Sequence, residues 1–401
     1  MTSTIGVKKI QYPNGTDILT LDSSGTLAIG GNITSNITTT GTVNTPSING
    51  GQISGRRNMI INGDFQCWQR GTGATSAANN YHPDRFKTNE NTDGTWTTEQ
   101  STDHPTGAGF SLKSQVTGAD TSIGSGQYAY LHQNIEAQNV KRLSYGTSSA
   151  KDFTLSFWVK SNKTGTYCIV VRKFDNTTYH LVHEYTISSA DTWEKKTITI
   201  TPTAGSTSFI TAAAGAHDQD TGTGFQIGWI LSMGSNLNGG TNNTWTATTS
   251  HYATTSQVNW MDNTSNNFYL AQVQLEEGSQ ATPFEHRTFG EELSLCQRYF
   301  HKQGGTAYYN IAVCVNYTSG AMLGTVRHPV EMRAAPSVTK SGNWGLLGGD
   351  TTVNQTAVSS DSNGQASEIG FSGGSGGTSG RSATLRFNND ANAYLHWDAE
   401  L

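Results

Sequence analysis

Two histidines three residues apart, His180 and His183, are the first pair whose spacing suggests chemistry, because neutral imidazoles are common metal ligands. They lie in an alternating apolar and polar stretch that predicts a β-strand. Successive side chains of a strand point to opposite faces, so residues three apart cannot reach the same ion. We therefore predict no metal site at this pair.

Carboxylates gather at two further places. His217 is followed by Asp218 and Asp220 in a Gly- and Thr-rich loop. Two carboxylates there could hold Ca²⁺ through oxygen ligands, and solvation of short polar side chains is the alternative account. Glu276 and Glu277 are adjacent on a predicted strand, so their side chains point apart. Glycoside hydrolysis instead needs two carboxyl groups that face each other about 5–10 Å apart.

Sequence motifs of the common enzyme classes are also missing. The chain has no P-loop, no G-x-S-x-G elbow, no H-E-x-x-H motif and no G-x-G-x-x-G followed by a helix. We therefore expect a protein that is not an enzyme, with no catalytic residues, no cofactor and no bound metal.

Aromatic residues in polar surroundings are more informative. Trp96, Trp245 and Tyr252 stand among Asn, Thr and Gly in predicted loops, and Trp344 has a similar setting near the C-terminus. An exposed ring can stack on the apolar face of a sugar while short polar groups meet its hydroxyls. These four residues are the predicted carbohydrate-binding residues. The alternative is that the rings cap the open ends of a β-sandwich.

Composition favours an all-β fold. Charged residues make up 14% of the 401, against about 25% in an ordinary globular chain, and Gly contributes 45 residues. The formal net charge of −5 leaves no basic surface for nucleic acid, and no apolar stretch is long enough for membrane insertion. The N-terminus lacks the apolar core of a signal peptide, so we expect the four cysteines to be reduced and packed.

The first 55 residues are expected to form a thin stem. Leu19 and Leu21 are echoed by Leu27 and Ile29 around a Gly-bearing turn, which predicts two short paired strands. So few apolar residues cannot bury enough surface in one chain, and three copies around a common axis would supply the missing contacts. A homotrimer whose stem docks on a larger assembly is the expectation, and a flexible leader is the alternative.

Residues 56–287 predict a jelly-roll β-sandwich, because strand patterns follow one another without helices between them. The clearest strand patterns lie at 153–159, 167–171, 181–187, 198–200, 225–231 and 269–275, with weaker ones near 58–61, 108–115 and 127–135.

A linking helix is predicted within 288–302. Leu293, Cys296 and Phe300 fall on one helical stripe, which would pack either on the sandwich or on copies of itself. Residues 303–401 predict a C-terminal β tip domain, with strand candidates at 307–315, 322–327, 383–387 and 393–397.

Several segments resemble the tail-fibre and virion-appendage proteins of tailed bacteriophages. The resemblance rests on residues 58–71, 84–86, 153–160, 192–196, 273–287 and 291–300, in that order along the chain. The sandwich is also similar to jelly-roll carbohydrate-binding modules of bacterial glycosidases, through its early Asn62-Gly63 segment and its closing strand. Those modules often hold Ca²⁺ partly through an acidic residue of that strand, where Gln272 and Gln274 stand here, so no Ca²⁺ is expected.

The resemblance implies a homotrimeric appendage of a virion assembled in the host bacterial cytoplasm. Its N-terminus would bind other virion proteins, and its distal parts would bind a host surface glycan or an outer-membrane receptor. Such binding would be multivalent, which raises avidity by roughly 10²–10⁴. Two alternatives stay open, a head fibre or structural connector without receptor binding and a polysaccharide depolymerase.

Overall fold

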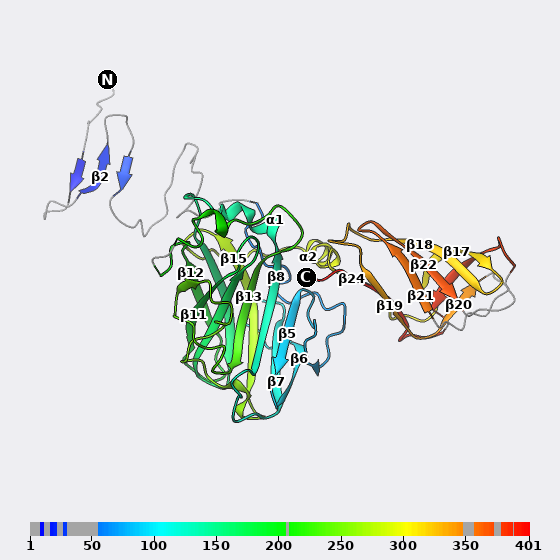
Figure 1. The fold of residues 1–401 in the computed structure, drawn as a ribbon, viewed down its shortest axis with the longest axis horizontal. Coiled ribbons are helices and arrows are strands. Elements are labelled where there is room, and N and C mark those ends of the chain that lie inside the picture. Colours follow the sequence, from blue (N-terminus) through cyan, green and yellow to red (C-terminus); the bar gives the residue numbers. More distant parts are fainter. Residues whose placement is uncertain are drawn as a thin grey trace, which may run out of the picture. The chain divides into compact units, whose positions relative to one another are not determined.

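The computed structural model describes the strands at 9–11, 17–21 and 27–29, and then residues 55–205, 208–347, 357–372, 378–387 and 389–401. The chain forms two compact units, Met1–Pro46 and Ser47–Leu401. In the first unit β1 (Lys9–Gln11), β2 (Asp17–Leu21) and β3 (Leu27–Ile29) form one antiparallel sheet (Figure 1). Leu19 pairs with Ile29 and Leu21 with Leu27, which confirms the predicted pair of strands. The rest of the predicted stem lies outside the described residues.

The second unit contains a sandwich of two six-stranded antiparallel sheets (Figure 1). Sheet I has the order β14-β11-β10-β13-β8-β5 and comprises β5 (Phe86–Asn91), β8 (Tyr128–Glu136), β10 (Gly165–Lys173), β11 (Tyr179–Ile187), β13 (Thr223–Met233) and β14 (Thr244–Thr246). Sheet II has the order β12-β9-β15-β7-β6-β4 and comprises β4 (Thr75–Ser76), β6 (Thr95–Ser101), β7 (Ser111–Gly118), β9 (Phe153–Ser161), β12 (Glu194–Ile200) and β15 (Asn267–Glu277). This is the predicted all-β, jelly-roll architecture.

Alternation along the strands builds the core between the sheets. The predicted inward residues of β9, Phe153, Leu155, Phe157 and Val159, are all fully buried. Trp229 of sheet I meets Phe157 of sheet II edge to face, with ring centroids 5.8 Å apart. Edge-to-face rings are a favourable arrangement, so the two sheets are joined by aromatic as well as aliphatic packing.

The segment that opens the sandwich is held against the strand that closes it. Asn58 donates from Nδ2 to the carbonyl of Val273 (3.0 Å) and accepts from the amide of Leu275 (3.0 Å). At Gly63 a Cβ would lie 2.1 Å from the carbonyl oxygen of Val273, so only glycine allows this approach. The weak strand prediction near 58–61 is wrong, because Asn58 side-chain bonds and turns replace a ladder there.

The linking helix is shorter than predicted. α2 (Phe289–Gln297) begins at a capping box made by Thr288 and Glu291. It ends before Phe300, which lies in strand β16 (Phe300–Gly304) and pairs with Asp398. Pairing of Phe300 with Asp398, almost 100 residues further along the chain, favours a strand over a helix at this position. No helix in the described part of the chain has the length and apolar character of a membrane span.

The remaining short helical segments are α1 (Ala137–Val140), η1 (Lys141–Leu143), η2 (Ala213–Gly215) and η3 (Trp260–Asp262).

The C-terminal residues form two antiparallel sheets. A three-stranded sheet has the order β16-β24-β19, with β19 (Ser337–Ser341) and β24 (Tyr394–Asp398). A six-stranded sheet has the order β20-β23-β17-β18-β22-β21, made of β17 (Asn310–Thr318), β18 (Ala321–Arg327), β20 (Trp344–Leu347), β21 (Ala357–Ser362), β22 (Ala366–Ser372) and β23 (Ser382–Phe387). Four of these nine strands had a matching sequence prediction. Of the other five, β16, β19, β21 and β22 carry mainly polar residues or glycine, and β20 has only four residues, so hydrophobic alternation does not mark them.

Ion pairs connect the C-terminal residues to the sandwich. Arg298 donates to both carboxylate oxygens of Glu136 (2.7 and 2.9 Å). Arg85 pairs with Glu400, and both side chains are buried. The last residues of the chain therefore contact sheet I directly.

Candidate functional site

Three of the four predicted carbohydrate-binding residues are buried. Trp96 is 1% exposed, and its ring packs edge to face on Trp260 at 5.6 Å. Trp245, also 1% exposed, donates from Nε1 to the carbonyl of Thr201 (3.0 Å). Their predicted positions in loops are wrong, because they lie in strands β6 and β14.

Trp344 is likewise buried, in strand β20. It is 3% exposed and meets Phe387 at 4.6 Å. The predicted exposure of all three tryptophans is wrong, since each fills space between sheets or at a sheet end. None of them offers a ring face on which a sugar could stack.

Tyr252 has a different setting, on the outer face of sheet I. It is partly exposed, and its ring lies 5.8 Å from Tyr130 and 5.3 Å from His180. The guanidinium of Arg172 lies 5.1 Å from the same ring. Tyr252 thus joins a group of aromatic and polar side chains that the sequence prediction did not include.

The strand register defines this group, which we call the outer face. Residues directly opposite each other in antiparallel strands point to the same side of a sheet. Three rows of residues cross sheet I on the side away from the core: Asn89, Tyr130, Ile230, Cys168 and Glu184; Lys87, His132, Gly228, Val170 and Val182; and Asn134, Gln226, Arg172, His180 and Thr246. Among these fifteen residues the one carboxylate is Glu184, which accepts a hydrogen bond from Thr254.

The prediction that His180 and His183 point to opposite faces of one strand is confirmed in β11. His180 stands opposite Arg172 on the outer face, whereas His183 stands opposite Ile169, whose side chain belongs to the core. The two imidazoles lie on opposite faces of the sheet, as the spacing predicts.

Polar side chains of the outer face hold one another in place. Arg172 donates from Nε to His180 Nε2 (3.0 Å) and from Nη1 to Gln226 Oε1 (2.9 Å). Gln226 donates in turn to Asn134 Oδ1 (2.9 Å), and Asn134 donates to the carbonyl of Leu401 (2.9 Å). This chain of planar groups runs across four strands, β11, β10, β13 and β8, to the C-terminus and fixes the rotamer of each member.

The hydrogen-bond roles determine the state of His180. Its Nε2 accepts from Arg172, so its Nδ1 carries the proton and donates to the carbonyl of His251 (3.1 Å). Burial and the adjacent Arg172 lower the pKa of His180 to about 4. Burial also lowers the pKa of His132 to about 3, so both imidazoles are neutral at pH 7.

Aromatic rings form the other part of the outer face. Tyr130 lies 5.7 Å from Tyr128 and 5.6 Å from His132. Its hydroxyl accepts from Asn89 Nδ2 (2.6 Å), which leaves the hydroxyl hydrogen to donate elsewhere. Tyr128 and Asn89 are partly exposed at the margin, whereas Tyr130 is 5% exposed and belongs to the floor.

Gly228 makes room in the floor for the side chain of Val170. Its neighbours in the row are His132 and Val170, and a Cβ at this position would meet Val170 at 2.9 Å. Beyond Lys87, a surface pocket of about 390 Å³ extends the polar surface past edge strand β5. Its lining includes Arg70, Tyr81, His82, Asn79 and Asp398.

The predicted acidic loop has an internal cation. Lys173 is buried and donates from Nζ to the carbonyls of Asp175 (2.9 Å), Thr177 (3.2 Å) and Ala214 (3.3 Å). Asp175 accepts from the amide of Asp218 (3.3 Å). The hydrogen bonds of this ammonium group go to backbone carbonyls and not to the carboxylates of Asp218 and Asp220 that the sequence singled out.

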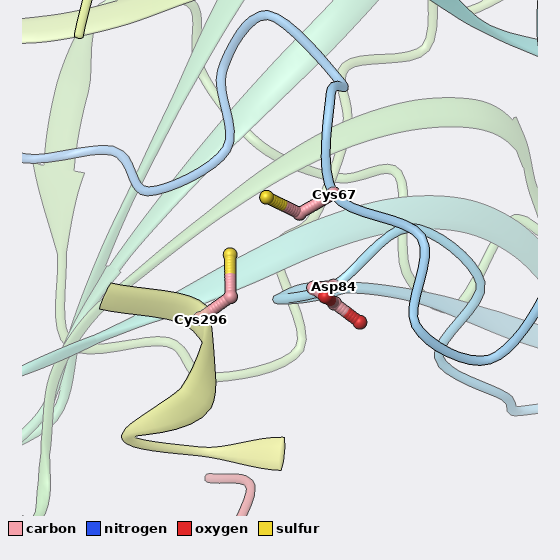
Figure 2. Close-up of side chains that lie close together, drawn as sticks. All are labelled: Cys67, Asp84 and Cys296. Atoms are coloured by element: carbon pink, nitrogen blue, oxygen red, sulfur yellow. The ribbon is translucent and has the colours of Figure 1, made fainter. Parts of the chain in front are cut away.

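A separate group of possible metal ligands lies beneath α2. Cys67, Asp84 and Cys296 are all buried, and one donor atom of each lies within 4.8 Å of the others (Figure 2). Cys296 is therefore a packing residue of the helix against the sandwich, one of the two predicted alternatives. Leu293 is partly buried, and Phe300 is buried but lies in β16.

Comparisons with known proteins give structural neighbours alone. No protein-family model matches the sequence, and no curated protein matches it. A putative sugar-binding protein of Bacteroides thetaiotaomicron has 15% identity and a TM-score of 0.31, with 55% of this chain and 100% of that chain covered. The family 11 carbohydrate-binding module of a cellulosomal cellulase of Clostridium thermocellum has 13% identity and a TM-score of 0.28, with coverage of 53% and 98%.

A tandem pair of carbohydrate-binding modules from Paenibacillus barcinonensis covers more of the chain. It has 8% identity and a TM-score of 0.26, with 82% of this chain and 97% of that chain covered.

Proposed function

We propose that the protein binds a glycan through the outer face of sheet I. The observation that carries the proposal is the pair of partly exposed rings of Tyr128 and Tyr252, both of which lie against the buried ring of Tyr130. Beside them the partly exposed Arg172 is held by Gln226. A pyranose ring has an apolar face that stacks on aromatic rings and a rim of hydroxyls that needs planar donors and acceptors.

The electrostatics of the outer face favour sugar hydroxyls. The neutral imidazoles of His132 and His180 keep the floor uncharged, while Lys87 and Arg172 supply the cations among the three rows. Two fixed cations and one carboxylate suit a neutral oligosaccharide or one with an occasional acidic group. The pocket beyond Lys87 gives such a chain room to continue past β5.

Binding to a panel of immobilised oligosaccharides, followed by calorimetry on any positive, tests the proposal. Replacing Tyr252 with alanine should weaken binding about tenfold, because one stacked ring contributes about 1–1.5 kcal/mol. Arg172→Ala should weaken it further, since Gln226 and His180 lose their shared partner. Tyr317→Ala, at a 70% exposed tyrosine of β17, is the matched control. Binding that survives both outer-face variants would place the site elsewhere, and no binding at all would refute the function.

For the biological setting, we propose a homotrimeric appendage of a bacteriophage virion that attaches to the host cell surface. The support is the order of matching segments in the sequence and the small N-terminal sheet, β1 to β3. Light scattering on the purified chain should give three times 43.0 kDa. Blocking of phage adsorption by the free protein tests the attachment role, and density for this chain at the capsid would instead favour a head fibre.

A further inference from the structure

Cys67, Asp84 and Cys296 come from three separate segments and converge under α2 (Figure 2). Cys67 lies in the loop that follows the opening segment, Asp84 in the loop before β5, and Cys296 in the last turn of α2. The exposed fraction of Cys67 is 2%, and Asp84 and Cys296 are fully buried. Two buried thiols beside a buried carboxylate are an arrangement that can hold a metal ion, because buried charges in proteins are paired or coordinate metals.

We infer that Cys67, Asp84 and Cys296 form a Zn²⁺ site. Two thiolates with one harder ligand favour zinc over calcium or magnesium, which prefer oxygen donors alone. In a tetrahedral zinc site with bonds of about 2.0–2.3 Å, the donor atoms are about 3.5–4 Å apart. The present separations, all within 4.8 Å, need only a small contraction around the ion.

Neighbouring groups already orient two of the three ligands. Asn62 donates from Nδ2 to the carbonyls of Cys67 (2.8 Å) and Asp84 (3.0 Å), and its Oδ1 accepts from the amide of Cys67 (2.9 Å). One side chain thus ties the two ligand-bearing loops together. Gln69 donates to Asp84 Oδ2 (2.9 Å), which orients the carboxylate as second-shell partners do in known metal sites.

The charges balance when the ion binds. Each thiol releases one proton to solvent, and two thiolates plus one carboxylate around Zn²⁺ leave a net charge of −1. Arg70, which also pairs with Asp398 and Glu400, has its Nη1 3.5 Å from Asp84 Oδ1 and offsets part of that charge. A water molecule would complete the tetrahedron as the fourth ligand.

The choice of zinc over a disulfide rests on Asp84. A bond between Cys67 and Cys296 would need an oxidant and no carboxylate, whereas the metal uses all three side chains. The site would fasten α2, and through it the C-terminal sheets that follow, to the opening loops of the sandwich. Zinc should accordingly raise the thermal midpoint of the whole chain.

Titration of the reduced, chelator-treated full-length protein with Co²⁺ tests this inference. One equivalent per chain should produce thiolate-to-cobalt absorption in the near ultraviolet and the visible bands of a tetrahedral ion, and Zn²⁺ should displace it. Cys67→Ser and Asp84→Asn should weaken binding at least about 100-fold. Cys168→Ser and Cys314→Ser change buried cysteines away from the cluster and should leave binding intact.

Circular dichroism of each metal-free variant checks that the fold survives, and Cys67→Ala serves if the serine variant does not fold. Absence of the cobalt bands in the folded wild-type protein would overturn the site. Loss of two hydrogen masses with no free thiol at these positions would overturn it in favour of a disulfide. Equal binding by the Cys168→Ser and Cys67→Ser variants would show that the ion binds elsewhere.

Discussion

Lowering the pH from 7 to 5 is expected to destabilise the protein by several kcal/mol, because five buried histidines resist protonation. Mainly through burial, the pKa falls to about 3 for His132 and His217 and to about 4 for His82, His180 and His301. In the unfolded chain all five return to about 6.5. The unfolded state therefore binds more protons below pH 6.5, and stability is lost as the pH falls from 6.5 towards 4.

The magnitude follows from the size of the pKa shifts. At pH 5 an unfolded histidine gains about 2 kcal/mol from protonation, while the native form stays neutral, so five residues amount to about 10 kcal/mol. Asp84 acts in the opposite direction, because burial raises its pKa to about 6. Its native protonation at pH 5 returns about 1 kcal/mol, which leaves a net loss of about 9 kcal/mol.

Urea unfolding at pH 7, 6 and 5, followed by tryptophan fluorescence, measures this loss. Near pH 5 the slope of the unfolding free energy against pH should correspond to about three to four protons. His180→Gln should reduce the slope by about one proton, whereas His104→Gln, at a partly exposed histidine, is the control. A midpoint that stays constant between pH 7 and pH 5 would refute the assignment of neutral buried histidines.

Two further predictions concern stability. Glu400→Ala leaves Arg85 buried without its carboxylate and should lower the unfolding free energy in urea by about 3–5 kcal/mol. The control, Glu368→Ala at an exposed site, should change the unfolding free energy little. Similar losses of unfolding free energy in the two variants would contradict the buried pair. Gly63→Ala places a Cβ 2.1 Å from a carbonyl oxygen of β15 and should lower the unfolding free energy by about 3 kcal/mol or more. Gly73→Ala is its control, because a Cβ there would meet nothing within 4 Å. Equal unfolding midpoints for the two variants would contradict the close approach.

Hydrophobic alternation predicted the strands that supply the core. In β9 and β13 the inward residues are large and apolar, so period two is plain in the sequence, and both strands form as expected. Strands β6 and β14 were missed because each carries a single tryptophan among threonines. A lone Trp96 or Trp245 between polar residues gives no period, and only the opposing sheet shows that its ring points inward.

The outer face could be predicted only in part. Tyr128, Tyr130 and His132 alternate with the core residues of β8, so a reader of the sequence could have found three ring-bearing positions on one side of a strand. Their neighbours could not be found in that way. Arg172 and Gln226 are 54 residues apart and meet because β10 and β13 pair across the sheet, which no local pattern specifies.

The location of the rings on strands has an energetic consequence for the proposed binding. A loop residue must give up rotamer and backbone freedom when a ligand orders it, which costs about 0.5–1.5 kcal/mol for each side chain. Arg172 is already held by His180 and Gln226, and Tyr130 by Asn89, all of them on paired strands. Most of this conformational entropy is therefore already lost in the free protein, which lowers the cost of binding a sugar to the outer face. Gln226→Ala, which releases Arg172 without removing a ring, should therefore weaken binding although Gln226 itself is 5% exposed. Calorimetry of the Gln226→Ala variant tests this preorganisation. If the exposed rings alone determined binding, the variant would bind the sugar as tightly as the wild-type protein does.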